Sequence, residues 1–248
     1  MKVVAVIPAR YAATRLPGKA LIMIAGKPMV QHVWERTRLA KSVSEVVVAT
    51  DDERIAGTVQ GFGGKAVMTR GDHRSGTERV AEVAARGDGD IYVNVQGDEP
   101  LVEPAAIEAA VQILLDGDAV RVATLAAPIT SAKDVMDPNI TKVVLDFESD
   151  ALYFSRAPIP WVRDTNAPVR AKHLKHLGIY VFRREALLEF TTFPYGELER
   201  VEQLEQLRWL ENGFKIRVEE IPFDAVSVDV PEDVARVEKI IQKAAKAT

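Results

Sequence analysis

The chain has 248 residues, of which 47% are hydrophobic and 27% are charged, and its formal net charge at pH 7 is −4. This length and composition are typical of a soluble globular protein and suffice for one large α/β domain, or one domain with an added lobe. No run approaches the roughly 18 consecutive apolar residues of a membrane span. The apolar run in the opening MKVVAVIPAR is too short for a signal peptide. The absence of cysteine excludes disulfides, thiolate catalysis and zinc–thiolate sites. We therefore expect a cytoplasmic protein without a membrane segment. Because its net charge is negative, we also expect that it binds no nucleic acid.

The first half of the chain alternates short apolar runs with helical patterns, which predicts βαβ units and a mostly parallel sheet flanked by helices. Strands are expected at residues 2–7, 46–50, 65–68 and 90–95. Helices are expected at about 28–41, 51–60, 76–86 and 103–116. Ser75 and Glu78 have the spacing of a capping box, which marks the start of the third helix.

From about residue 120 the pattern changes to strands with few helices between them, which predicts that the sheet becomes mixed. These strands are expected at 120–126, 140–146, 151–155 and 178–183. The helices that close the chain are expected at 199–213 and 231–246. Residues 157–172 are rich in proline and polar side chains and are interpreted as a flap. The whole of 1–248 is interpreted as one domain with an inserted lobe at about 140–190.

The loop after the first strand, PARYAATRLPGK, carries Arg10, Arg15 and Lys19 and no acid, and the first carboxylate of the chain is Glu35. Guanidinium and ammonium groups donate well to phosphate oxygens, and parallel α/β sheets bind ligands at the carboxyl ends of their strands. The loop matches neither the Walker A pattern nor GxGxxG. It is therefore either a phosphate site or a solvated loop whose cations pair with acids elsewhere.

Two acidic clusters are candidates for metal binding. QGDEP places Asp98 and Glu99 at the end of the predicted strand 90–95, where carboxylates are costly unless they are paired or bound to metal. Asp98 fits a magnesium ligand, because Mg²⁺ prefers one or two carboxylates plus substrate phosphates; an aspartate in a turn before Pro100 is the alternative. Asp229 precedes the last helix and is either its N-cap or a second metal ligand, and the pattern alone favours the cap.

Further polar residues adjoin the later strands. Arg156 follows one predicted strand and His176 precedes another, and an arginine beside a histidine would suit a substrate that bears a carboxylate. A structural histidine held by hydrogen bonds is the alternative for His176. Glu205 and Gln206 lie on the predicted helix 199–213, where such a pair is more often solvated surface.

Nine short motifs carry a resemblance to a known family. They are PARYAATRLPGKAL, ATD at 49–51, HRSGTER at 73–79, NVQGDEP at 94–100, KVVLD at 142–146, ALYFSRAPIPW at 151–161, KHLGIYVFR at 175–183, LEQLRWLENG at 204–213 and VDVPEDV at 228–234. In this order, and over nearly the whole chain, they closely resemble the CMP-Kdo synthetases, the 3-deoxy-manno-octulosonate (Kdo) cytidylyltransferases. The resemblance implies a CTP-dependent nucleotidyltransferase on a Rossmann-like sheet with an inserted dimerisation lobe. It would join CTP and Kdo into CMP-Kdo, releasing pyrophosphate, for lipopolysaccharide biosynthesis, and would act as a homodimer.

The resemblance also implies roles for individual residues. The nucleotide would be bound by Pro8, Ala9, Arg10, Arg15, Lys19, Arg74, Ser75, Gly76 and Asp98. The ligands of Mg²⁺ would be Asp98 and Asp229, and the sugar pocket would be lined by Gln96, Arg156, His176, Tyr180, Glu205 and Gln206. The catalytic set would be Arg10, Arg15, Lys19, Asp98 and Asp229. The anomeric hydroxyl would attack the α-phosphorus in line, a reaction driven by positioning and charge stabilisation rather than by a protein nucleophile.

Two positions depart from the family pattern, and several alternatives stay open. The chain has DPN at 137–139 where the family usually has NPN, and Val230 replaces a threonine, a loss of a hydroxyl cap that costs about 1 kcal/mol. Residues 162–172 match no family motif and could change which sugar is accepted. The closest alternative is transfer to another acid sugar, 8-amino-Kdo or a sialic acid. A non-catalytic nucleotide-binding protein and a nucleic-acid binder that uses the basic N-terminal patch are the others.

Overall fold

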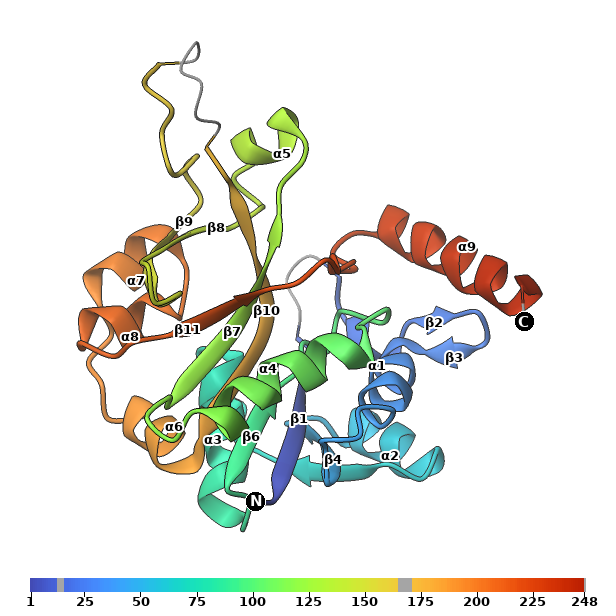
Figure 1. Cartoon of the computed structure of the whole chain (residues 1–248). Helices are drawn as coiled ribbons and strands as arrows, with labels where there is room; N and C mark the ends of the chain where they lie inside the picture. The colour runs from blue at the N-terminus through green and yellow to red at the C-terminus, as the bar shows by residue number, and fades with distance from the viewer. Residues whose placement is uncertain (13–15, 165–170, 248) are drawn as a thin grey trace.

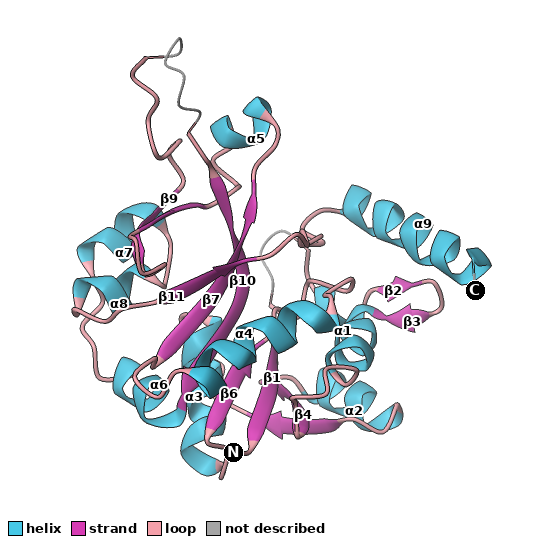
Figure 2. Cartoon of the chain, in the orientation of Figure 1, coloured by secondary structure: helices cyan, strands magenta, loops and turns pink. Residues whose placement is uncertain are grey.

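A mixed sheet forms the centre of the molecule, and helices cover both of its faces (Figures 1 and 2). The computed structural model describes residues 1–12, 16–164 and 171–247. Within those ranges the sheet has nine strands, seven of them in the order β11-β7-β10-β6-β1-β4-β5, with β8 joined to β10 and β9 joined to β8.

The elements have the following bounds. The strands are β1 (Val3–Ala9), β2 (Met23–Ile24), β3 (Lys27–Pro28), β4 (Glu45–Thr50), β5 (Lys65–Met68), β6 (Ile91–Asn94), β7 (Val122–Pro128), β8 (Lys142–Leu145), β9 (Ala151–Ser155), β10 (Leu174–Arg183) and β11 (Arg217–Glu220). The helices are α1 (Met29–Thr37), α2 (Glu53–Gly61), α3 (Gly76–Arg86), α4 (Pro104–Asp116), α5 (Ala132–Met136), α6 (Arg184–Phe190), α7 (Glu197–Glu202), α8 (Leu207–Glu211) and α9 (Pro231–Ala247), with a short 3-10 turn η1 (Lys19–Leu21). The patterns do not predict β11, α5 or α6.

The order of the strands creates a ligand site at the end of β1. β1 pairs in parallel with β4 on one side and with β6 on the other, and β4 pairs in parallel with β5. β10 is antiparallel to β6 and β7, so the predicted fold class, a mostly parallel mixed sheet flanked by helices, is confirmed. The chain leaves β1 toward β4 and returns on the other side through β6. The carboxyl end of β1 is therefore the topological switch point, where sheets of this kind bind ligands.

The apolar run of β1 is continuous because both faces of the sheet are buried. Ala5 and Ile7 belong to the core on one face, together with side chains of α1, α2 and α4. Val4 and Val6 belong to the core on the opposite face, with side chains of α3, α6 and α8. Strand β1 is thus clamped between two helical layers, which gives the loop that follows it a rigid support.

The helix predicted over 199–213 is wrong as a single element. It is two short helices, α7 and α8, because Gln203 adopts a left-handed conformation with φ 56° and ψ 45°. The leucines at every third position are compatible with one helix, but the reversal at Gln203 buries Leu204 and Leu207 in the core and turns Glu205 toward α3. The stop at Gly213 is confirmed, since this residue has φ 78° and its N–H donates to the carbonyl of Leu210.

Hydrogen bonds hold the backbone at both departures from the family pattern. The carboxylate of Asp137 accepts from the backbone N–H of Asn139 at 2.8 Å, so the DPN turn is closed as an asparagine would close it. At the start of α9, Oδ2 of Asp233 accepts from the backbone N–H groups of Asp229 and Val230, at 2.9 and 3.1 Å. Asp233 thus holds the backbone that enters α9, whereas the bond that a threonine hydroxyl at 230 would accept from the first turn is not replaced by it.

The predicted lobe at 140–190 is only partly separate from the main sheet. β8 and β9 form an antiparallel pair at the upper end of the sheet in the view of Figure 1, and β9 pairs only with β8. β10, by contrast, runs through the main sheet between β6 and β7. That this region is a dimerisation lobe stays a prediction. Across the described ranges, none of the helices combines the length and the hydropathy needed to cross a bilayer.

Candidate active site

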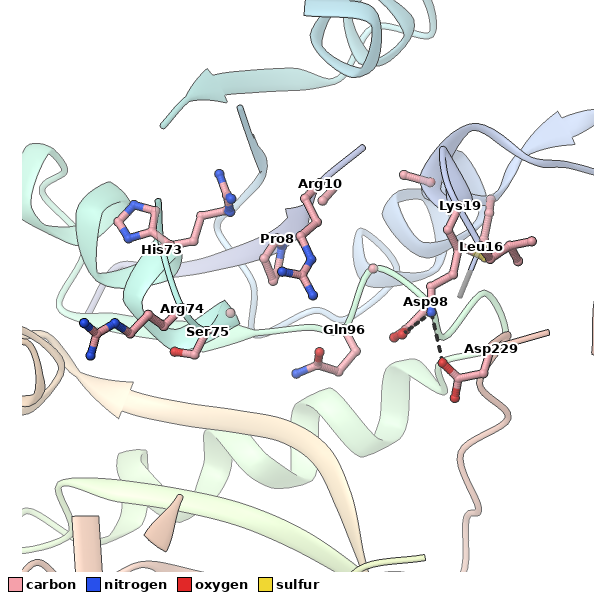
Figure 3. A pocket seen from close by; sticks show the side chains of 16 residues that line it. Pro8, Arg10, Leu16, Lys19, His73, Arg74, Ser75, Gln96, Asp98 and Asp229 are labelled. Atoms are coloured by element: carbon pink, nitrogen blue, oxygen red, sulfur yellow. Dashed lines mark hydrogen bonds and ion pairs between the residues drawn. The ribbon is translucent and has the colours of Figure 1, made fainter. Parts of the chain in front are cut away.

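A cavity of about 420 Å³ lies at the switch point. It is lined by Pro8, Ala9, Arg10, Leu16, Lys19, Ala20, Met29, His73, Arg74, Ser75, Gly76, Arg79, Gln96, Gly97, Asp98 and Asp229. Figure 3 shows two ends: the turn of Arg74 and Ser75 lies at one, the cluster of Lys19, Asp98 and Asp229 at the other, with Arg10 and Gln96 between them. We call it the switch-point cavity.

The loop after β1 brings two of its predicted cations into the cavity. Gly18 has φ 68°, a left-handed conformation that favours glycine, and its N–H donates to the carbonyl of Tyr11 at 2.9 Å. This turn closes the loop and sets Lys19 at the first position of η1, with a side chain only 16% exposed. Arg10 lines the same cavity. Arg15 lies outside the described residues.

Lys19 joins the two predicted metal ligands. Its Nζ donates to Oδ2 of Asp98 at 2.7 Å and to Oδ1 of Asp229 at 3.2 Å. The backbone supports this meeting, because the N–H of Val228 donates to the carbonyl of Asp98 at 2.9 Å. The carboxylate of Asp229 is thus engaged in the cavity, while Asp233 binds the backbone at the start of α9. The geometry favours the ligand interpretation of Asp229 over the cap that the pattern favours.

The donor set fits a magnesium ion that shares its coordination with a substrate. Two carboxylates already meet one cationic group, the ammonium of Lys19, and both side chains are about one-third exposed, at 31% and 33%. Mg²⁺ binds through one or two carboxylates and takes phosphates and water for its other ligands. Across the described ranges no three Asp, Glu, His or Cys side chains gather as a metal site.

The opposite end of the cavity is the N-terminus of α3. The predicted N-cap is confirmed: Oγ of Ser75 accepts from the N–H of Glu78 at 3.2 Å, whereas Oε2 of Glu78 accepts from the N–H of Arg74, one residue before the cap, at 2.8 Å. A helix N-terminus offers unpaired N–H groups and a partial positive charge. The turn formed by Arg74, Ser75 and Gly76 therefore presents hydrogen-bond donors to whatever occupies this end.

Two residues of the motif HRSGTER line the cavity although the sequence analysis assigns them no role. Arg79 is buried, and its guanidinium pairs with Asp51 at 3.2 Å and donates to the carbonyl of Arg70. His73 contacts Oε2 of Glu82 through Nε2. Their position inside a motif already singled out was the available signal. They tie the loop before α3 to α3 itself, and α3 to the residue that follows β4.

A second, smaller hollow of about 220 Å³ shares the same turn. It is lined by Arg74, Ser75, Gly76, Tyr195, Glu199, Gln203, Leu204 and Glu205. Glu205 belongs to the predicted sugar set, and its carboxylate accepts from Oγ1 and N of Thr77 at 2.7 and 3.4 Å. Burial raises the pKa of Glu205, although the hydrogen bonds from Ser75 and Thr77 act in the opposite direction. Glu205 is therefore a half-buried, hydrogen-bonded group and not the solvated surface that a helical pattern suggests.

The other predicted sugar residues lie apart from the two cavities. Gln96 lines the switch-point cavity, but Arg156, His176, Tyr180 and Gln206 line neither cavity. The guanidinium of Arg156 donates to the carbonyls of Glu202 at 2.7 Å and Pro138 at 2.9 Å. Gln206 is buried, with 4% of its surface exposed.

His176 and Tyr180 form an aromatic pair in which Tyr180 is buried and His176 is half-buried. Their ring centroids are 5.2 Å apart, and burial raises the pKa of Tyr180 well above its usual value. Burial also lowers the pKa of His176 to about 3, so the imidazole is neutral at physiological pH. A neutral imidazole offers a substrate carboxylate a hydrogen bond but no charge.

A doubly wound sheet with cations and paired carboxylates at its switch point defines a nucleotide-binding α/β enzyme. Residues 4–221 match the model of the cytidylyltransferase family. The chain is 54% identical to the 3-deoxy-manno-octulosonate cytidylyltransferase of Geobacter metallireducens and 53% identical to that of Geobacter sulfurreducens. The alignments cover 98% of this chain and 98% and 99% of those proteins, respectively. The chain belongs to the cytidylyltransferase family, and within it to the 3-deoxy-manno-octulosonate cytidylyltransferases.

Solved structures agree with this assignment. A CMP:2-keto-3-deoxy-manno-octonic acid synthetase, solved in complex with CTP, superposes with a TM-score of 0.94 at 46% identity and covers 98% of this chain and all of its own. A 4-diphosphocytidyl-2C-methyl-D-erythritol synthase from Anaerococcus prevotii, at 11% identity and a TM-score of 0.65, shares the fold alone. The predicted family and fold are confirmed by these comparisons.

Proposed function

We propose that the switch-point cavity joins CTP to Kdo and that each of its groups has a defined role in this reaction. The enzyme transfers CMP from CTP to the anomeric hydroxyl of Kdo, giving CMP-Kdo, a precursor of lipopolysaccharide, and pyrophosphate. The observation that carries the assignment of roles is the meeting of Lys19, Asp98 and Asp229 at one end of the cavity, opposite the N-terminus of α3.

CTP would lie along the length of the cavity. Its cytosine would contact the turn of Arg74, Ser75 and Gly76, where N–H groups and side chains offer hydrogen bonds. Its triphosphate would extend toward Arg10 and Lys19, and Arg15 completes this predicted set of cations. Charge that builds up on the departing pyrophosphate is then next to fixed cations, which is the main source of catalysis in phosphoryl transfer.

Asp98 and Asp229 would hold Mg²⁺. The ion supplies neutralisation of the phosphate charges when it is bound. Lys19 bridges the two carboxylates, and in the reaction its ammonium would donate to a phosphate oxygen of CTP. The same cluster thereby keeps two carboxylates close together in the free enzyme at low electrostatic cost.

Kdo would enter beside the nucleotide, next to Gln96 and Glu205. Gln96 already faces the switch-point cavity and Glu205 the smaller hollow, and the turn of Arg74 to Gly76 borders both. Arg156, His176, Tyr180 and Gln206 line neither cavity, and their contacts with the sugar are part of this proposal. 8-Amino-Kdo and sialic acid are the rival sugars that the experiment below separates.

We also propose a homodimer that acts in the cytoplasm. β9 forms an edge of the sheet, and exposed edges favour pairing with another chain. Large apolar side chains in and around this strand are exposed: 61% of Leu152, 74% of Trp161 and 76% of Val201. A second copy of the chain is the proposed cover of this surface.

A chain without cysteine is compatible with the reducing cytoplasm.

Pyrophosphate release tests the proposed substrate. The wild-type protein is mixed with CTP, Mg²⁺ and either Kdo, 8-amino-Kdo or N-acetylneuraminate, and release is followed continuously. We expect release with Kdo. Release with only another sugar would leave the type of reaction unchanged and assign the enzyme to that sugar. No release from folded protein that binds CTP would refute the enzymatic assignment.

Size-exclusion chromatography with light scattering tests the dimer, which a monomer at micromolar concentration would contradict.

A further inference from the structure

Strand β10 carries an irregularity directly between His176 and Tyr180. In its pairing with β7, Leu177 lies opposite Leu125, but the next matched residue, Tyr180, lies opposite Thr124. Two residues of β10, at 178 and 179, therefore have no counterpart in this ladder. Bulges of this kind redirect the neighbouring side chains and are common beside active sites.

The carbonyl groups of the bulge are bound by side chains from two other strands or their loops. Nε2 of Gln96 donates to the carbonyl of Gly178 at 2.9 Å. Oγ1 of Thr124 donates to the carbonyl of Ile179 at 2.7 Å. A Cβ at Gly178 would come within 2.9 Å of the Gln96 side chain, so only glycine allows this close contact. The bulge is thus held from both sides.

Thr124 also contacts the ring of His176. The hydroxyl is fully buried, and its oxygen lies 3.0 Å from Nε2 of His176. A hydroxyl has one hydrogen, and three acceptors lie within its reach: the carbonyls of Ile179 at 2.7 Å and Leu177 at 3.2 Å, and Nε2 of His176. When either carbonyl takes the hydrogen, the oxygen can only accept from the imidazole, which requires hydrogen on Nε2. Because the shortest contact is to a carbonyl, the geometry favours hydrogen on Nε2 of His176.

The surroundings keep this imidazole uncharged. The edge of Phe154 packs against the ring with centroids 5.0 Å apart, and Tyr180 packs at 5.2 Å. Both neighbours are neutral, as is Thr124, and burial lowers the pKa of His176 to about 3. A neutral imidazole with hydrogen on Nε2 has an unprotonated Nδ1, which accepts hydrogen bonds.

We infer that Thr124 is a positioning residue for the sugar: its hydroxyl fixes His176 as the Nε2–H tautomer, so that Nδ1 accepts a hydrogen bond from a sugar hydroxyl. The inference rests on the proposed function only in placing the sugar next to His176. It assigns His176 to hydroxyl recognition and leaves the sugar carboxylate to other groups. The carbonyl of Ile179 in the bulge orients the hydroxyl of Thr124, and this hydroxyl in turn sets the tautomer of the His176 ring.

The tautomer is measured directly by nitrogen NMR of the wild-type protein. Two-bond ¹H–¹⁵N spectra distinguish Nε2–H from Nδ1–H imidazoles, and the chain has only four histidines, so the His176→Gln variant identifies the signal. We expect His176 to keep the Nε2–H pattern, without protonation, from about pH 5 to 8.5. An Nδ1–H pattern, or a titration near pH 6.5, would overturn the inference.

Kinetics of two variants test the positioning role. Thr124→Val removes the hydroxyl at nearly constant volume, and Thr124→Ser retains it. We expect the valine variant to raise the KM for Kdo roughly tenfold, the effect of one lost hydrogen bond, with the KM for CTP unchanged. The serine variant should restore the wild-type KM and tautomer. A Kdo KM and a tautomer that are unchanged in Thr124→Val would contradict the inference.

Failure of the inference and failure of the proposed function give different results. If the wild-type enzyme does not use Kdo, the proposed function is wrong, but the spectra still report whether Thr124 fixes the tautomer of His176. If the enzyme uses Kdo and His176 has hydrogen on Nδ1, only the inference is wrong. Should Thr124→Val fail to fold, the wild-type spectra and the serine variant decide the question.

Discussion

Lys19 and Asp229 lie 210 positions apart in the sequence and meet in one ion pair, with Nζ 3.2 Å from Oδ1. The contact joins the loop after the first strand to the segment before the last helix. α9 packs against the β2–β3 hairpin through Val237 and Ile24, which holds that segment in place. The two ends of the sequence therefore complete the cavity together, and Asp98 from the loop after β6 joins them.

Replacing Lys19 should slow transfer strongly and preserve the fold. We expect Lys19→Ala to lower kcat by about 10²–10³-fold, the usual effect of removing one fixed donor to transition-state charge. Lys27→Ala is the matched control, because Lys27 is exposed and pairs with Glu35 on the surface. The measurement is steady-state pyrophosphate release, with circular dichroism as a check on folding. Near-normal turnover in Lys19→Ala would remove this residue from the catalytic set.

The two carboxylates should control the requirement for magnesium. We expect Asp98→Asn and Asp229→Asn each to raise the Mg²⁺ concentration for half-maximal activity by at least about tenfold, since each removes one charged ligand. Because both residues act on one ion, the double variant should lose less than the product of the two single effects. Activity titrations with Mg²⁺ provide the test. Unchanged magnesium dependence in either variant would place the ion elsewhere.

Arg208 is predicted to be important for stability because it lies in a buried ion pair. Its guanidinium makes two 2.6 Å hydrogen bonds to Glu199, and both side chains are only 4% exposed. We expect Arg208→Met to lower the free energy of unfolding by about 3–5 kcal/mol, because Glu199 would be left buried without a partner.

The surface pair of Arg121 and Glu189 is the matched control, with side chains 43% and 45% exposed. Arg121→Met should cost at most about 1 kcal/mol. Urea unfolding of both variants measures the difference. A loss in Arg208→Met no greater than in Arg121→Met would show that burial does not decide the strength of this pair.

His176 should make the fold sensitive to acid. Its pKa is about 3 in the folded protein and near 6.5 when unfolded, so between these values the unfolded state binds more protons. Its contribution to stability is complete above about pH 6.5 and is lost as the pH falls toward 3. We expect wild type to lose at least about 1 kcal/mol more than His176→Gln between about pH 7 and 4. Denaturant unfolding at the two pH values gives the comparison, and equal losses would mean that His176 titrates normally.

Much of the site was predictable because it follows from strand order. Arg10, Lys19 and Asp98 come directly after strands whose parallel pattern is visible in the sequence, and the carboxyl ends of such strands meet. Asp229 was harder, since a residue before a helix is usually a cap, and only the packing of α9 places it in the cavity. The resemblance to a family supplied that assignment.

Other features depend on tertiary contacts that no local pattern contains. The leucine spacing over 199–213 fits one helix equally well, and the left-handed Gln203 is visible only in the folded chain. The neutrality of His176 results from burial against Phe154 and Tyr180, which come from two different strands. The role of Thr124 depends on a bulge in the strand next to its own, which sequence periodicity does not reveal.

The central claim is that this cavity couples the α-phosphorus of CTP to the anomeric oxygen of Kdo. Phosphorus NMR of the wild-type protein with CTP, Kdo and Mg²⁺ tests it most directly, because substrate, nucleotide product and pyrophosphate give separate signals. The account predicts equal amounts of CMP-Kdo and pyrophosphate, and slower formation of both from Asp98→Asn at the same Mg²⁺ concentration. Pyrophosphate with free CMP in place of CMP-Kdo, or bound CTP that stays intact, would contradict it.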